Sequence, residues 1–115
     1  AVFCFNDLMA IGALKVFSDA GITIPDQVSL AGFDNIEYSA FTQPPLTTFD
    51  QPKRAIGSQA ALMLLDFIKS SGNGSAETIV RTMQGQLLVR SSTAAINSGS
   101  YSTIHSEEGL REFNH

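Results

Sequence analysis

The chain has few of the features on which disulfide-bonded, membrane-spanning and nucleic-acid-binding proteins depend. Cys4 is the one cysteine among 115 residues, so an internal disulfide is excluded, and its place inside an apolar run indicates a small buried side chain rather than a reactive thiol. The longest apolar runs are far shorter than the roughly 20 residues of a membrane-spanning helix. Seven Lys and Arg are scattered against eleven Asp and Glu, and this net charge of −4 leaves no basic surface for DNA or RNA.

The residue patterns of catalytic and metal sites are missing as well. There is no Gly-x-Gly-x-x-Gly, P-loop or Gly-x-Ser-x-Gly motif, and no Cys or His pair stands at metal-ligand spacing. His105 and His115 lie in the polar, Ser-rich segment 95–115, which we expect to be a loosely held tail. We therefore predict that the chain is not an enzyme, has no catalytic residues, and holds neither a metal nor a cofactor.

The order of apolar runs and turn residues predicts an α/β domain. Ala1–Phe5 is expected as a buried strand, Leu8–Ala20 as a helix that ends at Gly21, and Val28–Phe33 as a second strand. Two apolar strands joined by one helix form a βαβ unit, which predicts a parallel sheet buried on both faces. After a loop, the further expected elements are an extended segment at Leu46–Phe49, a helix from about Pro52 to Ser70, and extended segments at Thr78–Met83 and Gln86–Val89.

The first apolar strand has no initiator Met, no neighbouring strand and no targeting segment before it. Because a buried strand needs partners on both sides, we expect the chain to be the C-terminal part of a larger protein. The first helix also carries more apolar residues than one sheet face needs. The surplus predicts a second packing partner, either the rest of the domain or another subunit, and the residues expected to serve this dimer or lobe packing are Met9, Ala13, Leu14 and Phe17.

Two expected strands end in a short polar pair, Asn6-Asp7 after the first and Asp34-Asn35 after the second. Ligands of open parallel sheets bind beyond the carboxyl ends of the strands, so Asn6 and Asp34 are candidate binding residues for a hydroxyl-rich ligand or a purine. Phe5 and Phe33 could supply the apolar walls, although phenylalanines in such positions more often belong to the core. Asp7 is expected to be the helix cap, and Asp34 could instead only begin a turn.

Four stretches, in this order, resemble motifs of LacI/GalR-type transcription regulators. Residues 3–14 read FCFNDLMAIGAL, residues 24–35 read IPDQVSLAGFDN, residues 44–52 read PPLTTFDQP, and residues 87–94 read LLVRSSTA. The resemblance covers residues 1–94 and implies an α/β fold, part of the type I periplasmic-binding-protein-like architecture with two lobes of parallel sheets flanked by helices. By this analogy, 1–49 and about 78–94 belong to the C-terminal lobe and 50–70 form a helix of the N-terminal lobe.

The resemblance also implies a function for the parent protein. Such regulators are cytoplasmic homodimers that bind a small effector, here a sugar or a related polar metabolite, between their lobes. Asn6 and Asp34 occupy positions that commonly contact the effector, and the first helix lies in the region used for dimerisation. Operator DNA would be bound through a helix-turn-helix domain that is absent from this chain, and no membrane is involved.

Two other interpretations of the sequence are open, and the first of them shares the fold. A periplasmic sugar-binding protein of a transport system would have a similar pocket, but the Pro-Pro-Leu-Thr-Thr and Val-Arg-x-Ser-Thr stretches resemble those of the regulators. An enzyme built on a flavodoxin-like sheet would need a catalytic constellation that the sequence does not offer.

Overall fold

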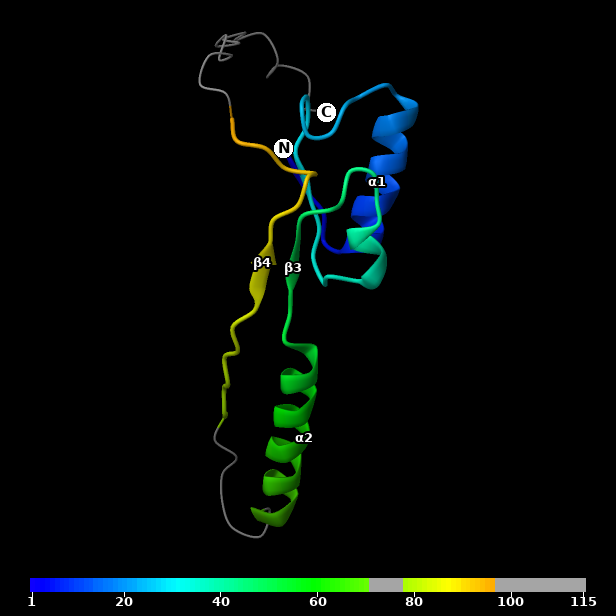
Figure 1. Cartoon of the computed structure of the whole chain (residues 1–115). Coiled ribbons are helices and arrows are strands. Elements are labelled where there is room, and N and C mark those ends of the chain that lie inside the picture. Colours follow the sequence, from blue (N-terminus) through cyan, green and yellow to red (C-terminus); the bar gives the residue numbers. More distant parts are fainter. Residues whose placement is uncertain (71–77, 97–115) are drawn as a thin grey trace, which may run out of the picture.

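A computed structural model of the chain describes residues 1–70 and 78–96 (Figure 1). Segment 95–115, predicted to be a polar tail, lies outside the described residues apart from its first two. The elements in chain order are β1 (Val2–Phe3), α1 (Asp7–Asp19), β2 (Leu30–Ala31), the 3-10 helix η1 (Glu37–Ala40), β3 (Thr48–Asp50), α2 (Lys53–Ser70) and β4 (Gln86–Leu88).

The first three elements form the predicted βαβ unit. β1 pairs with β2 in parallel, with Val2 opposite Leu30 and Phe3 opposite Ala31. α1 crosses between the two strands and ends where the sequence indicated, because Gly21 takes the left-handed conformation (φ 70°) that ends many helices. The parallel strands place their carboxyl ends at one edge of the sheet.

Two further strands extend this unit on the side of β2. An isolated parallel bridge between Ala31 and Thr47 joins β2 to the start of β3, and β4 then pairs with β3 in the antiparallel direction. The buried Ser92 closes the arrangement, since its hydroxyl donates to the carbonyl oxygen of Leu30 (2.6 Å) and accepts from the backbone N–H of Thr47 (2.7 Å). These two hydrogen bonds of Ser92 therefore hold the end of the described chain against the sheet.

The βαβ unit together with β3, β4 and the chain to residue 96 forms a first body of the structure. Its core is small and lies between α1 and the sheet. Its buried apolar side chains are Ala10, Leu14, Leu30 and Leu46, and the partly buried side chains packed against them are Cys4, Ala13, Phe17 and Ile24. Leu14, which was predicted to pack on another lobe or subunit, is only 8% exposed and belongs to this core. That prediction is therefore wrong for Leu14, whose side chain contributes to the fold of its own chain.

The prediction that the sheet is buried on both faces is also wrong for the described residues. β1 is paired only with β2, and the side chain of Phe3 is 68% exposed. An apolar strand at this edge leaves its backbone groups and side chains available to a further strand.

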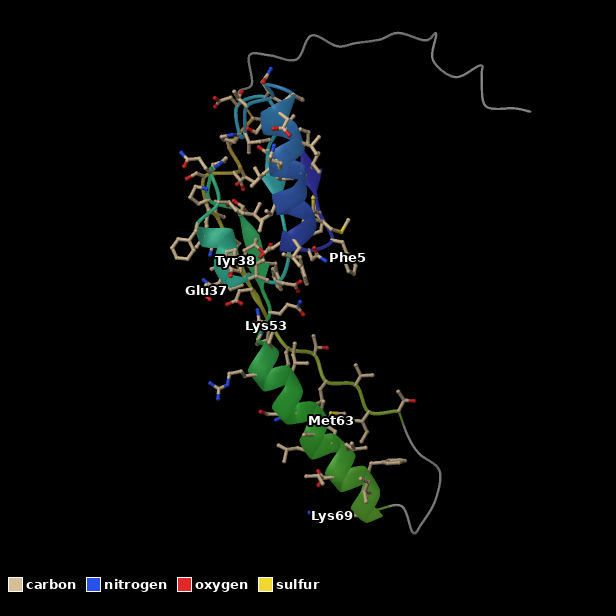
Figure 2. The ribbon with its side chains drawn as sticks, turned by 90° about the vertical axis from the view of Figure 1, so that its right-hand side faces the viewer. Phe5, Glu37, Tyr38, Lys53, Met63 and Lys69 are labelled. Carbon is tan, nitrogen blue, oxygen red and sulfur yellow. The ribbon has the colours of Figure 1, made fainter. Side chains whose placement is uncertain are left out.

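α2 stands apart from this first body. Figure 1 shows it beyond the β3 end, alongside the returning chain that leads to β4. In Figure 2, Lys53 marks the junction and Met63 lies midway along the helix. The helix has many exposed apolar side chains, including Leu62, Leu64 and Leu65 at 51–59% exposure. A hollow of about 310 Å³ separates it from the returning segment and is lined by Ile56, Gln59, Ala60, Met63, Arg81 and Met83.

Candidate functional site

The carboxyl ends of β1 and β2 are joined by a direct hydrogen bond. The backbone N–H of Asp7 donates to the carbonyl oxygen of Phe33 at 2.9 Å. Asn6 precedes the donor by one residue and Asp34 follows the acceptor by one residue, so both flank the same bond. The structure thus brings the two predicted binding residues to one edge of the sheet.

Asn6 caps α1 with one half of its amide. Its backbone is extended, and its Oδ1 accepts from the backbone N–H of Met9 at 2.8 Å. The amide nitrogen has no hydrogen-bond partner among the described residues, which leaves a donor at the sheet edge. Asp7 was predicted to be the cap, and this is wrong because Asp7 is already the first helical residue.

Asp7 is instead a fully buried carboxylate. Its Oδ1 accepts from the hydroxyl of Thr48 at 2.6 Å, and its Oδ2 accepts from the backbone N–H of Ile36 at 2.9 Å. The N-terminus of α1 favours a negative charge at this position. Asp7 therefore connects three segments: the start of α1, strand β3 and the loop that follows β2.

That loop begins with two residues in an uncommon backbone conformation. Asp34 has φ 108° and Asn35 has φ 48°, values that side-chain-bearing residues seldom adopt. The backbone N–H of Asn35 donates to Thr48 Oγ1 at 3.2 Å, and its side-chain Oδ1 accepts from Arg90 Nη2 at 2.9 Å. Arg90 Nη1 also donates to the carbonyl oxygen of Leu46 at 2.8 Å. Both β3 and the chain after β4 thus hold the turn.

The Asp34 carboxylate faces the point where the chain leaves for α2. Its Oδ1 accepts from Gln51 Nε2 at 2.7 Å, while its backbone carbonyl oxygen accepts from Lys53 Nζ. Lys53 also forms an exposed ion pair with Asp50 at 3.4 Å. Oδ2 of Asp34 has no partner within the described part of the chain. The turn therefore presents one carboxylate oxygen next to the connection between the first body and α2.

Aromatic side chains lie at the same edge. Phe33 is half-buried and stacks on Phe49, with ring centroids 5.1 Å apart and planes 10° apart. Gly85 makes this possible, because a Cβ atom there would come within 2.3 Å of the Phe49 ring. Phe5 is 82% exposed, so the described residues do not include it in a core. The Phe33 ring is thus held by its contact with Phe49, whereas Phe5 is exposed in the described structure.

Side chains able to ligate a metal, and the thiol of Cys4, are further chemical features of the described part of the chain. Within residues 1–70 and 78–96, no group of three or more His, Cys, Asp and Glu side chains could hold a metal ion. Partial burial raises the pKa of the Cys4 thiol, which lowers the thiolate fraction at neutral pH and agrees with the predicted role as a small packed side chain.

Sequence reasoning missed three residues that organise this edge: Thr48, Arg90 and Asn35. The signal for Thr48 was a hydroxyl in a short expected extended segment between apolar residues, because a hydroxyl needs partners where such a segment is buried. The signal for Arg90 was a lone cation between apolar and small residues. Thr48 lies 41 residues from Asp7 and Arg90 lies 55 residues from Asn35, which is why no local pattern revealed these contacts.

Comparison with known proteins agrees with this architecture. Residues 1–93 match a family described as periplasmic binding protein-like domain. Over 94 residues the chain is 44% identical to the HTH-type transcriptional repressor PurR of Aliivibrio fischeri strain ES114, a match that covers 82% of this chain and 27% of the repressor.

Two solved structures are similar in fold. The transcriptional regulator CelR in complex with cellobiose has a TM-score of 0.71 and 31% identity, covering 79% of this chain and 27% of that one. The lac repressor dimer bound to operator and the anti-inducer ONPF has a TM-score of 0.68 and 28% identity, covering 81% and 31%. The chain thus spans about a quarter to a third of these relatives, all of which are transcription regulators and none a transport protein. No helix in the described residues is long and apolar enough to cross a membrane.

Proposed function

We propose that this chain, which belongs to the periplasmic-binding-protein-like family of LacI/GalR-type transcription regulators, is the effector-binding and dimerisation segment of such a regulator. The observation that carries the proposal is the polar pair at the sheet edge. Asn6 offers an amide donor and Asp34 a carboxylate acceptor on either side of one backbone hydrogen bond. The segment acts by binding, without catalysis and without a cofactor.

The effector that fits this pair is a sugar or a related polar metabolite. A sugar hydroxyl both donates and accepts, so adjacent hydroxyls can bond to the Asn6 amide and to the Asp34 carboxylate together. The Phe33 ring, held by its stack on Phe49, offers an apolar surface for the C–H face of a sugar ring. The similar regulator CelR was solved with cellobiose, which supports a saccharide.

The chain contributes to two lobes in this proposal. Residues 1–49 and the later part of the stretch 78–94, from β4 onward, belong to the C-terminal lobe, and the helix within 50–70 belongs to the N-terminal lobe. The earlier part of that stretch was also predicted for the C-terminal lobe, but it runs alongside α2 (Figure 1), where Arg81 and Met83 line a hollow against the helix, and we assign it to the N-terminal lobe. The separation of α2 from the first body and the exposed apolar side chains along it support this division. Asp34 then lies beside the connection between lobes, since Gln51 and Lys53 bond to it from the start of that connection.

The dimer contact is proposed on the exposed side of α1. Met9 and Val16 are 57% and 65% exposed and lie seven residues apart, which places them on one stripe of the helix. Of the residues expected to serve dimer packing, only Met9 is on this side, because Ala13, Leu14 and Phe17 pack against the chain's own core. The parent protein would bind operator DNA through a domain outside this chain and would act in the cytoplasm.

The test is a calorimetric titration of the full-length regulator and its Asp34→Ala variant. The probes are ribose, glucose, galactose and cellobiose. We expect at least one sugar to bind the wild type, and the variant to bind it at least about tenfold more weakly, a loss of about 1.4 kcal/mol. Asp26→Ala, at an exposed carboxylate away from the sheet edge, is the matched control and should bind normally. Unchanged affinity in a folded Asp34→Ala variant would refute the assignment.

A further inference from the structure

We infer that Asp7 and Thr48 are positioning residues for the effector-binding carboxylate of Asp34. They hold the Asp34–Asn35 turn in the conformation that presents the Asp34 side chain to the effector. The inference rests on the proposed function and names what keeps its site in place. Neither side chain is exposed, since both are completely buried, so neither can touch an effector directly.

The turn needs external support because its backbone is strained. Asp34 and Asn35 are successive residues other than glycine at positive φ, 108° and 48°, a conformation that is unfavourable for residues with a side chain. Such a conformation persists only where the surroundings hold it, and strained residues of this kind gather at binding sites. Asp34 therefore points where it does because of its neighbours rather than its own preference.

The support comes from one short chain of hydrogen bonds. The Thr48 hydroxyl accepts from the backbone N–H of Asn35 and donates to Asp7 Oδ1, so both of its roles are in use. Oδ2 of Asp7 accepts from the backbone N–H of Ile36, the next residue of the loop. Two consecutive backbone N–H groups are thus fixed, one directly and one through Thr48, by a carboxylate at the start of α1.

This chain also links the two halves of the site. Asp7 follows Asn6 directly, and its own backbone N–H is bonded to the carbonyl oxygen of Phe33, just before Asp34. Asp7 therefore sets the spacing between the Asn6 donor and the Asp34 acceptor. Preorganisation of this kind raises affinity because the ligand need not select a rare turn conformation.

The decisive variant is Thr48→Val in the full-length regulator. Valine has nearly the shape of threonine but no hydroxyl, so the N–H of Asn35 and Oδ1 of Asp7 both lose their partner. With the sugar that binds the wild type among ribose, glucose, galactose and cellobiose, we expect calorimetry to show at least tenfold weaker binding. Thr48→Ser retains the hydroxyl and should restore affinity to within about twofold of the wild type.

A double-mutant cycle separates positioning from a general structural defect. If Thr48 acts only through Asp34, adding Thr48→Val to Asp34→Ala should change sugar affinity by less than twofold, because the group being positioned is already gone. A general defect would instead weaken binding further in the double variant.

Each remaining outcome decides the inference. Wild-type affinity in folded Thr48→Val, or failure of Thr48→Ser to restore binding, overturns it while leaving the proposed function intact. If Thr48→Val does not fold, Asp7→Asn takes its place, since the amide has one acceptor oxygen and cannot accept from both the N–H of Ile36 and the hydroxyl of Thr48. If neither variant folds, the two residues serve stability alone and the inference fails. If no sugar binds the wild type, the proposed function itself fails, and the inference with it.

Discussion

At the scale of single residues, the sheet edge depends on the absence of a side chain at Gly32. A Cβ atom there would lie 2.2 Å from Asp7 Oδ1, 3.1 Å from Leu46 Cδ2 and 3.2 Å from the Cα of Asp7. The first contact is with the carboxylate that supports the Asp34 turn, and the third is with backbone. Neither partner is the free end of a flexible side chain, so even one methyl group must displace the start of α1.

Gly32→Ala should therefore destabilise the protein. Overpacking of a tight interior typically lowers the free energy of unfolding by about 1–3 kcal/mol, and loss of the Thr48–Asp7 bond would add to it. Gly12→Ala is the matched control, because Gly12 is an exposed residue of α1 with nothing within 4 Å of a Cβ atom. That control should raise stability by about 0.5–1 kcal/mol. The comparison uses Tm from calorimetry, and equal Tm values for Gly32→Ala and wild type would contradict the packing described.

At the scale of the elements, the side chain of Asn6 caps α1 and, in the proposed function, also supplies a hydrogen-bond donor to the effector. Asn6 Oδ1 accepts from the backbone N–H of Met9, and its amide nitrogen has no hydrogen-bond partner among the described residues. The two functions use different atoms and can be separated by substitution. Aspartate is as good an N-cap as asparagine but has no N–H group to donate.

Asn6→Asp should leave helix stability near that of the wild type but weaken sugar binding, since the donor is lost and a second carboxylate stands beside Asp34. Asn6→Ala should lose both functions, with a cost of about 1 kcal/mol to stability from the missing cap. Tm and calorimetric affinity, measured on both variants, give the comparison. Full sugar affinity in Asn6→Asp would show that the amide of Asn6 does not bind the effector.

The elements that the sequence predicted well are those fixed by neighbouring residues. The apolar runs of β1 and β2 and the glycine after α1 gave the βαβ unit, because strand burial and helix ends leave local patterns. The antiparallel β3–β4 pair, η1 and the positive φ values of Asp34 and Asn35 were not foreseen. They depend on contacts such as Thr48 with Asp7 and Arg90 with Asn35, between residues far apart in sequence.

At the scale of the whole molecule, the described residues form one small core and one detached helix. Their apolar faces remain uncovered on β1, on the outer side of α1 and along α2. The relatives of this chain are roughly two and a half to three times as long, which agrees with further segments and a partner subunit covering these faces in the proposed regulator.

Substitutions on the two sides of α1 distinguish dimerisation from folding. Met9→Glu places a charge on the exposed stripe and should weaken the dimer of the full-length regulator without unfolding it. Leu14→Glu buries a charge in the core and should prevent folding, since an unpaired buried charge is costly. Light scattering and circular dichroism report the two effects. A folded Met9→Glu variant that stays fully dimeric would place the dimer contact elsewhere.

The central claim is that effector binding at Asp34 changes the affinity of the regulator for DNA. The most direct test measures the operator affinity of the full-length regulator with and without sugar, for wild type and Asp34→Ala. Fluorescence anisotropy gives this affinity on an operator fragment selected with the wild type. Coupling between effector and DNA typically changes affinity about 5- to 150-fold. We predict such a change for the wild type, and for Asp34→Ala the same ligand-free operator affinity with no response to the same sugar concentration. A variant that responds to sugar as the wild type does would contradict the account.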